Sequence, residues 1–422
     1  MKRKIIQVNE RPPVGQSVFL SLQHMFAMFG ASVLVPILLG INPAIVLLMN
    51  GIGTLIFIFI TKGKAPAYLG SSFAFIMPAL IVIGSAGYRY ALGGFVVTGA
   101  IFCVVALIIK FFGTKWINIV LPPAAMGPVV ALIGLELAGV SVGSIISDGV
   151  TAIDPHVYIV FFATLAVAIF GSILFRKFFA VIPILVAMVV GYVLAICFGM
   201  IDFGAVAQGH WFQLPNFELP LFSLSTILVI IPAAIVVIAE HIGHQLVTSK
   251  IVEKDLLEDP GLHRSLLGDG ISTLLSGLVG SVPTTTYGEN IGVMAITKVY
   301  SVWVIGGAAV ISIILSFIGM VSGAIIAMPA AVIGGVSFLL YGMIAASGIR
   351  LMVESKIDYG NARNLALTAV VFITGLSGVS FHIGDVEFKG MILAAIVGVV
   401  LSLIFHILDK FKLTNDYEKG KA

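Results

Sequence analysis

Charge is scarce in this chain. Only 10% of its 422 residues are Asp, Glu, Lys or Arg, 59% are hydrophobic, and the mean hydropathy is +1.14. Soluble domains carry about 25% charged residues, so the composition excludes an ordinary soluble domain and gives no support to a nucleic-acid partner. It indicates an all-α polytopic membrane protein whose main surroundings are the lipid bilayer.

Cysteine is scarce too. Cys103 and Cys197 are the only two, and both lie in apolar stretches, which is typical of packing positions rather than of a disulfide framework or a metal site. We find no HExxH zinc-protease pair and expect no strand-to-helix nucleophile elbow. The motifs "GDVEFKG" and "DPGLHRS" are interpreted as ordinary loops. The chain is therefore predicted not to be an enzyme and to need no cofactor.

Long apolar stretches recur along the whole chain. About 20 such residues are enough to cross a hydrocarbon core of about 30 Å. With the N-terminus inside, 21 of the 23 basic residues fall on one side, because only Arg89 and Lys389 (23 minus 2) fall on the other. The longest outer loops, 141–156 and 201–221, contain no Lys or Arg, so both termini are predicted to be cytoplasmic. The pattern predicts about fourteen spans, near 17–39, 43–61, 66–84, 90–111, 116–140, 157–175, 178–200, 222–248, 266–280, 283–299, 302–321, 325–348, 365–380 and 390–408.

Two pairs of segments repeat across the chain at similar offsets. "PAYLGSSFAFIMP" (Pro66–Pro78) resembles "PTTTYGENIGVMA" (Pro283–Ala295), and "LPPAAMGPVV" (Leu121–Val130) resembles "MPAAVIGGVS" (Met328–Ser337). Both pairs map the first seven spans onto the last seven. Because seven is odd, the two halves must lie inverted in the membrane, as in many secondary transporters.

One span of each half contains a segment that is unsuited to a helix. Thr284–Tyr287 are strand formers and Gly288 permits a break, and Leu69–Ser72 have the same character. We expect short β-strands here, in spans three and ten, each followed by a helix that starts near mid-membrane. Non-helical backbone at this depth is tolerated only inside the protein or beside a wet cavity. Two helix N-termini would then provide free N–H groups for hydrogen-bond acceptors.

Two acids lie in these apolar surroundings. Glu289 follows the break at Gly288, and Glu240 shares a long apolar span with His241 and His244. A carboxylate at bilayer depth costs roughly 2.5–3.5 kcal/mol on insertion scales, so each acid is a candidate functional residue. Glu240 and His244 are four residues apart and share one helix face, whereas His241 points elsewhere and is interpreted as a packed core residue.

Four further polar residues lie within apolar spans. We interpret Asp269 as a tether between helices and Glu136 as a hydrogen-bonding group in a packed region, with a functional role as the alternative for each. Gln23 and His24 are interpreted as polar contacts between helices, with ligand contact as the alternative.

These residues carry a resemblance to the nucleobase–ascorbate transporter family. "ENIGVMAITK" (Glu289–Lys298) is similar to that family's signature, which is Glu, Gln or Pro, then Asn, any residue, Gly, four residues, Thr and a basic or small residue. "SLQHMFAMFG" (Ser21–Gly30) resembles the Gln-His motif of its first span. The likeness extends over nearly the whole chain and is strongest to the bacterial members that take up uracil. It includes "KAPAYLGSSFAFI", "LPPAAMG", "VVIAEHIGH" and "DPGLHRS".

The resemblance implies both an architecture and a site. The architecture has two inverted seven-span repeats, residues 1–205 and 206–422, with a core domain and a gate domain interleaved across both. In the site, two carboxylates hold a base, two backbone N–H groups donate to it, and a histidine supports proton handling. The implied substrate-binding residues are Glu240, Glu289, Phe73, Gly288, Ser72, Ala31, Tyr287 and Tyr341, and the implied proton-coupling residues are Glu240, His244 and Glu289.

The implied function is proton-coupled uptake of uracil across the bacterial cytoplasmic (inner) membrane by alternating access. The chemistry agrees, because carboxylates accept from the two N–H groups of uracil and helix N-termini donate to its two carbonyls. An uncharged ligand is accumulated only with a coupled ion. Two acids in one low-dielectric pocket oppose each other's ionisation, so a proton is the expected ion. The family often dimerises, which makes a homodimer a further expectation.

Two other transport functions stay open. A xanthine or purine permease of the same family would share the fold and the pocket backbone, although Glu rather than Gln at position 289 favours uracil. An anion exchanger or channel of a related fold is the second alternative. The two buried acids disfavour it, because they repel anions.

Overall fold

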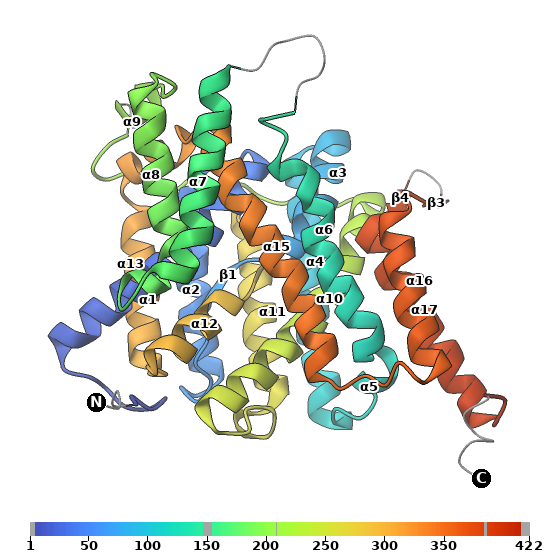
Figure 1. Cartoon of the computed structure of the whole chain (residues 1–422). Helices are drawn as coiled ribbons and strands as arrows, with labels where there is room; N and C mark the ends of the chain where they lie inside the picture. Colours follow the sequence, from blue (N-terminus) through green and yellow to red (C-terminus); the bar gives the residue numbers. More distant parts are fainter. Residues whose placement is uncertain (1–4, 147–153, 208, 384–385, 415–422) are drawn as a thin grey trace.

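The computed structural model describes residues 5–146, 154–207, 209–383 and 386–414. Helices dominate these residues, and many of them run between the upper and lower ends of the molecule (Figure 1). Part of the outer loop expected at 141–156 lies outside the described residues.

The described residues form a helical membrane protein, as predicted. Eight of their helices are long and apolar enough to cross a membrane: α1 (Val14–Leu39), α2 (Pro43–Ile60), α4 (Tyr88–Phe112), α6 (Pro123–Ser141), α7 (Pro155–Leu174), α10 (Leu224–Val252), α15 (Ala330–Glu354) and α17 (Gly390–Lys410). A ninth span results if α13 (Val302–Ser316) and α14 (Gly319–Ile326), which meet at 84°, are counted together. The other helices of the described residues are α3 (Ile76–Ala86), α5 (Ile117–Val120), α8 (Pro183–Cys197), α9 (Gly204–Ala207), α11 (Leu262–Val279), α12 (Gly288–Thr297) and α16 (Ala362–Leu376), with single turns η1 (Phe73–Phe75), η2 (Phe179–Val181) and η3 (Leu257–Gly261).

Two short strands lie where the sequence predicts breaks. Strand β1 (Leu69–Ser71) pairs antiparallel with β2 (Thr284–Thr286), so that Gly70 lies opposite Thr285. The chain leaves β1 through η1 into α3, and leaves β2 directly into α12. The prediction of strands in the third and tenth apolar segments is confirmed.

A second hairpin corrects one expectation. Strand β3 (Ser380–Ile383) pairs antiparallel with β4 (Val386–Lys389). The expectation that "GDVEFKG" is an ordinary loop is therefore wrong for its residues Val386–Lys389, which form β4. Apolar and charged residues alternate along β4, and this two-residue period suits a strand. The Nζ of Lys389 lies 2.9 Å from Oε2 of Glu387, which adds an ion pair along the strand.

Close helix contacts depend on glycine. Gly99 on α4 faces the backbone of Leu274 on α11, and Gly134 on α6 faces the carbonyl of Tyr341 on α15. A Cβ at either glycine would collide with the partner's backbone. Since lipid tails are as apolar as the helices, membrane helices associate largely through such close approach of small residues.

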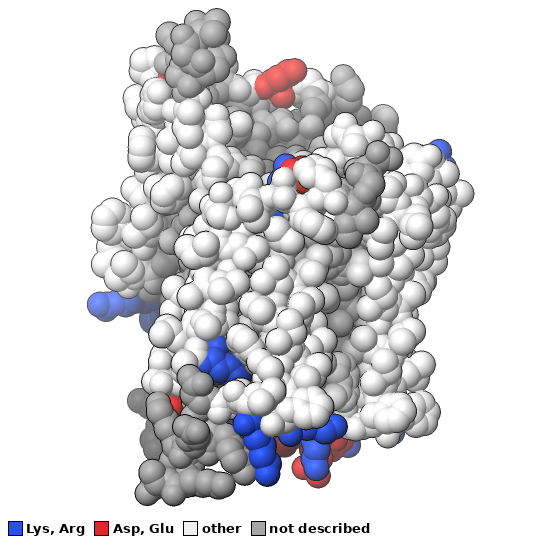
Figure 2. All heavy atoms as spheres, turned by 90° about the vertical axis from the view of Figure 1, so that its right-hand side faces the viewer, with Lys and Arg blue, Asp and Glu red and all other residues white. Residues whose placement is uncertain are grey.

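Charged side chains are sparse over the middle of one face of the molecule. Figure 2 shows one face on which Lys and Arg gather mainly toward the lower end, below a broad surface almost without charge. The loop between α15 and α16 lies at that same end in Figure 1. An uncharged band beside a basic end is typical of a protein seated in a bilayer.

Glu136 joins α6 to α17. Its Oε1 accepts the backbone N–H of Met391, in the first turn of α17, where helix N–H groups otherwise lack partners. Gly390 precedes Met391 with φ of +58°, and a Cβ there would meet the Glu136 carboxylate. The interpretation of Glu136 as a hydrogen-bonding group in a packed region is confirmed.

We expect Glu136→Ala to lower the thermal unfolding midpoint of the purified protein. The Met391 N–H would lose its acceptor, at a cost of about 1–3 kcal/mol for a buried donor. Glu136→Gln keeps a carbonyl oxygen in this place and is the matched control, with a smaller loss. An unchanged midpoint in Glu136→Ala would contradict this role.

Candidate functional site

A cavity of about 430 Å³ lies beside the two strand–helix breaks. Its wall includes Phe73 at the start of η1, and Gly288 and Glu289 at the start of α12. Helix α10 contributes Glu240 and His244. The two breaks and the acid-bearing helix, which are far apart in the sequence, therefore meet at one cavity.

The cavity extends along α10 and α15 toward the ends of these helices. Ser347, Arg350 and Glu354 line it on α15. The Oε1 of Glu354 accepts from Arg350 Nε at 2.7 Å, and its Oε2 lies 3.6 Å from Nζ of Lys250 on α10. The cavity thus reaches toward the end of the molecule that carries these basic side chains.

The two helix starts supply backbone donors. The residues before them are extended, Ser72 with φ −76° and ψ 126°, and Tyr287 with φ −95° and ψ 131°. Among the described residues, no side chain caps either start. The first N–H groups of a helix have no partner within it, and its N-terminus carries partial positive charge. Both starts can therefore bind carbonyl oxygens of a ligand.

The two acids supply acceptors on the same cavity. Glu289 lies in the first turn of α12, and Glu240 lies in the second half of α10. Both side chains are half-buried and line the cavity. An ionised carboxylate is purely a hydrogen-bond acceptor, so the acids complement N–H donors. The cavity combines donors for carbonyl groups with acceptors for N–H groups.

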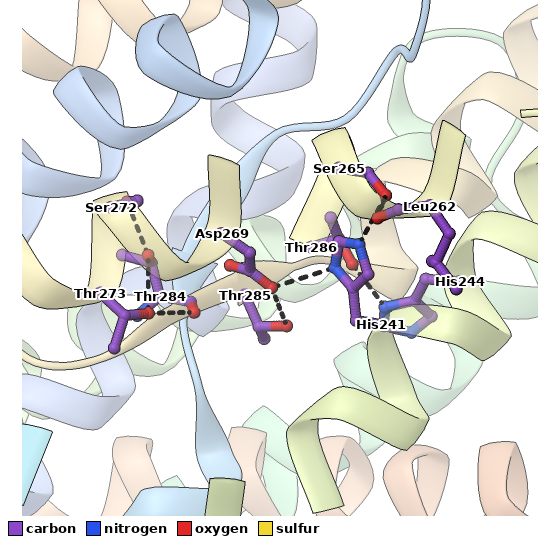
Figure 3. A network of polar contacts seen from close by, with 10 residues as sticks. All are labelled: His241, His244, Leu262, Ser265, Asp269, Ser272, Thr273, Thr284, Thr285 and Thr286. Carbon is purple, nitrogen blue, oxygen red and sulfur yellow. Dashed lines mark hydrogen bonds and ion pairs between the residues drawn. The ribbon is translucent and has the colours of Figure 1, made fainter. Parts of the chain in front are cut away.

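His244 connects the acid-bearing helix to the second break. Its Nδ1 lies 3.1 Å from Oγ1 of Thr286, the last residue of β2 (Figure 3). A Cβ added at Gly288 would lie 3.4 Å from its Nε2, so the other ring nitrogen is beside the start of α12. The imidazole therefore contacts both sides of the break while it shares a helix face with Glu240.

A buried network behind the cavity fixes β2. The two ring nitrogens of His241 lie 3.0 Å from Asp269 Oδ2 and 3.0 Å from Ser265 Oγ, and Thr285 Oγ1 donates to the same Asp269 oxygen at 3.3 Å (Figure 3). All four residues are buried. The network joins α10, α11 and β2. The interpretations of His241 as a packed residue and of Asp269 as a tether are confirmed.

A third polar contact holds α12 against α1. His24 Nδ1 lies 3.1 Å from Oδ1 of Asn290, and both residues are buried. The interpretation of His24 as a polar contact between helices is confirmed. The residue next to Glu289 is thereby tied to the first helix of the chain.

The structure brings most of the predicted site residues to the cavity. Ala31, Ser72 and Tyr341 are exceptions, since each is at most 2% exposed and lies outside the residues that form its lining. The ring of Tyr341 nevertheless contacts that of Phe73, with centroids 6.3 Å apart. The predicted residues that line the cavity are Phe73, Glu240, His244, Tyr287, Gly288 and Glu289.

Other lining residues of the cavity were not predicted from the sequence. Gly243, Val247 and Ile251 line the cavity from α10. They follow Glu240 at helical spacing, so the period of this helix could have identified them. Thr285 and Thr286 also line it, as the last two residues of the strand that precedes the break.

We expect Thr285→Val to loosen the strand pair, because the substitution keeps the shape of the side chain but removes the hydroxyl that donates to Asp269. The loss of a typical intramolecular hydrogen bond costs about 0.5–1.5 kcal/mol. Amide hydrogen exchange in β1 and β2 should become faster, whereas Thr285→Ser should keep the wild-type rate. Equal rates in all three proteins would show that this bond does not hold the strand.

Comparison with known proteins identifies close relatives. The permease family Xan_ur_permease matches residues 15–384. The chain is 57% identical over 412 residues to the uracil permease of Escherichia coli strain K12, covering 97% of this chain and 96% of that protein. It is 56% identical over 421 residues to the uracil permease of Paenibacillus larvae subsp. larvae, covering 99% of this chain and 100% of that protein.

A solved structure resembles the fold. The transmembrane domain of the cyanobacterium bicarbonate transporter BicA matches with a TM-score of 0.65, covering 95% of this chain and all of that one (100%). The two sequences are 14% identical. The likeness therefore concerns the fold alone.

Proposed function

This chain belongs to the Xan_ur_permease family of permeases, and on that basis we propose that it carries uracil across a membrane together with protons. The family match covers residues 15–384, and the two relatives named above as uracil permeases are 56–57% identical to the chain over nearly its whole length. The resemblance to nucleobase transporters is confirmed. The chain is a membrane transporter rather than an enzyme.

One observation supports uracil most directly, namely the combination of groups on the cavity. Uracil is a flat ring with two N–H donors and two carbonyl acceptors. Two carboxylates and two uncapped helix starts offer the complementary set. The ring of Phe73 also lines the cavity and can stack on the base. A site built from paired polar groups rejects analogues that leave one of them unpaired.

We assign roles to individual residues within this proposal. The carboxylates of Glu240 and Glu289 accept from the N–H groups of the base, while the backbone N–H groups of Phe73 and Gly288 donate to its carbonyls. His244 exchanges protons with Glu240. Four residues complete the pocket around the base: Tyr287, which lines the cavity, and the buried residues Ser72, Ala31 and Tyr341.

The proposed membrane arrangement has fourteen spans in two inverted repeats, residues 1–205 and 206–422. The antiparallel pairing of β1 with β2 supports it, since each repeat contributes one strand followed by one helix. In this arrangement a core domain holds the strand pair and a gate domain moves against it, so a site at mid-membrane faces each side in turn. Both termini lie in the cytoplasm of a bacterial cell, and the membrane is the inner one.

Proton coupling follows from the charge of the ligand. Uracil is uncharged, so its accumulation requires a coupled ion. Glu240 and Glu289 share one cavity, where two negative charges oppose each other. A proton bound at either acid relieves this repulsion, and His244 is placed beside the same site. A homodimer of the chain is part of the proposal by analogy with the family.

The two alternative transport functions fit the residues of the site less well. A xanthine or purine permease would use the same backbone donors, and the names of the close relatives favour uracil over it. An anion exchanger would share the fold seen in the bicarbonate transporter. The two acids on the cavity repel an anion, which disfavours this function.

Uptake by purified protein in liposomes tests the proposal. We expect radiolabelled uracil to accumulate when the pH gradient is directed inward, and the accumulation to collapse when a protonophore is added. Xanthine, adenine and bicarbonate serve as competing substrates and should compete weakly. Sodium-dependent uptake that resists the protonophore would contradict proton coupling, and preference for a purine or an anion would contradict uracil as the substrate.

Variants of the two acids test the assigned roles. We expect Glu289→Gln to abolish uracil binding, because it removes the charge and replaces one acceptor oxygen with an NH2 group, which cannot accept an N–H of the base. Glu240→Gln mimics the protonated acid and should keep part of the binding but lose net accumulation. His244→Ala should shift the pH dependence of uptake more than it weakens binding. Equal loss of binding in both Gln variants, with an unmoved pH profile in His244→Ala, would contradict the division of roles.

A further inference from the structure

Helix α12, which carries Glu289, is short and packs against the protein on one side, where Asn290, Ile291, Val293 and Met294 are buried. It has only 10 residues, and an isolated helix shorter than about 12–15 residues is marginal in water. One side of it faces open space, because Gly292, Ala295 and Ile296 line the cavity together with Glu289. The contacts at its two ends therefore add to this one-sided packing in fixing the position of the helix.

The N-terminal end is held by the strand pair. Strand β2 runs directly into α12, and Tyr287 N donates to the carbonyl of Tyr68 at 3.3 Å just before the helix begins. Asn290 adds the contact with His24 described above. This end is therefore tied to β1 and to α1.

The other end is held by the beginning of the chain. Lys298 ends α12 with φ of +61°, and its carbonyl accepts from Ile6 N at 3.0 Å. Tyr300 N donates back to the carbonyl of Ile6 at 2.9 Å. Residues 6 and 299 thus form a parallel bridge, although more than 290 positions separate them.

Further contacts extend this pairing. Val302 N donates to the carbonyl of Val8 at 2.9 Å, and the hydroxyl of Ser301 donates to the carbonyl of Glu10 at 2.6 Å. The side chain of Val8 is 1% exposed. The segment also lies against α13, since the guanidinium of Arg11 is 5.0 Å from the ring centroid of Trp303. Residues 6–11, which we call the N-terminal strap, are therefore docked over their whole length.

We propose that the N-terminal strap is a positioning element for the substrate site. It fixes the C-terminal end of α12, while the strand pair fixes the other end, and together they set the place of Glu289 and of the helix N–H groups beside it. The helix rises about 1.5 Å per residue, so a tilt at one end displaces the acid at the other. This inference rests on the proposed function for its effect on uracil, but the docking of α12 can be measured without a ligand.

The main test is Ile6→Pro in the full chain, which removes the N–H that donates to Lys298. We expect calorimetry to give a uracil Kd that is about tenfold higher, or about 1.4 kcal/mol, with the binding stoichiometry unchanged. A merely structural segment would reduce the stoichiometry through unfolded protein and leave the Kd as it was. Ile5→Pro is the matched control, because Ile5 lies one residue outside the bridge with its side chain 45% exposed.

A second variant and a second measurement cover the remaining outcomes. Ser301→Ala removes one contact of the strap and should raise the uracil Kd by a smaller factor than Ile6→Pro does. It replaces Ile6→Pro as the test variant if Ile6→Pro fails to fold. Hydrogen exchange at residues 288–297 should be about tenfold faster in Ile6→Pro or, failing that, faster in Ser301→Ala. If the wild-type protein does not bind uracil, the proposed function fails. Hydrogen exchange at residues 288–297 then tests by itself whether the strap positions α12. The inference would be overturned if every variant that folds had the wild-type Kd, or if only the binding stoichiometry fell. If the wild-type protein does not bind uracil, wild-type exchange rates in every folded variant would overturn it.

Discussion

The antiparallel pair of β1 and β2 is the constraint on which the rest of this structure depends. Each strand has three residues, and all six are buried. Backbone groups without partners in a bilayer cost several kcal/mol each, so two spans can leave the helical conformation here only because each satisfies the other. Ser72 N extends the pairing at one end by donating to the carbonyl of Pro283 at 2.9 Å. The pairing then frees two helix starts beside the cavity.

Side-chain hydroxyls support this pair from the helices around it. Thr54 on α2 accepts from Leu69 N at 2.9 Å, and Thr273 on α11 donates to the carbonyl of Thr284 at 2.9 Å. Thr285 bonds to Asp269, as described above. These groups serve as partners at the ends and edges of strands that are too short to satisfy every group between themselves. The abundance of Ser and Thr in these apolar surroundings is thus explained by the backbone that they support.

Much of this arrangement could be predicted from the sequence because its signals are local. Three threonines before Gly288 disfavour a helix at that place, and an acid four residues from a histidine defines a helix face. The burial of Tyr341 could not be predicted, since it depends on how α15 packs, with the Tyr341 ring against that of Phe73. The β3–β4 hairpin was not predicted because its strands have four residues each, and an alternation as short as that of β4 does not distinguish a strand from a loop. The N-terminal strap joins segments that no local pattern connects.

The contacts around the cavity differ in kind, and this difference suits the proposed transport cycle. The acids and helix starts are held to one another by directional hydrogen bonds of the strand pair and the His241–Asp269 network. Two contacts that α15 makes across the cavity are less directional than these hydrogen bonds. Glu354 and Lys250 form a partly exposed ion pair, which contributes at most about 1 kcal/mol, and Phe73 meets Tyr341 through their rings. Neither contact fixes one geometry. The acids and the helix starts can therefore keep their arrangement while α15, which carries Tyr341, moves past them, which is what alternating access requires.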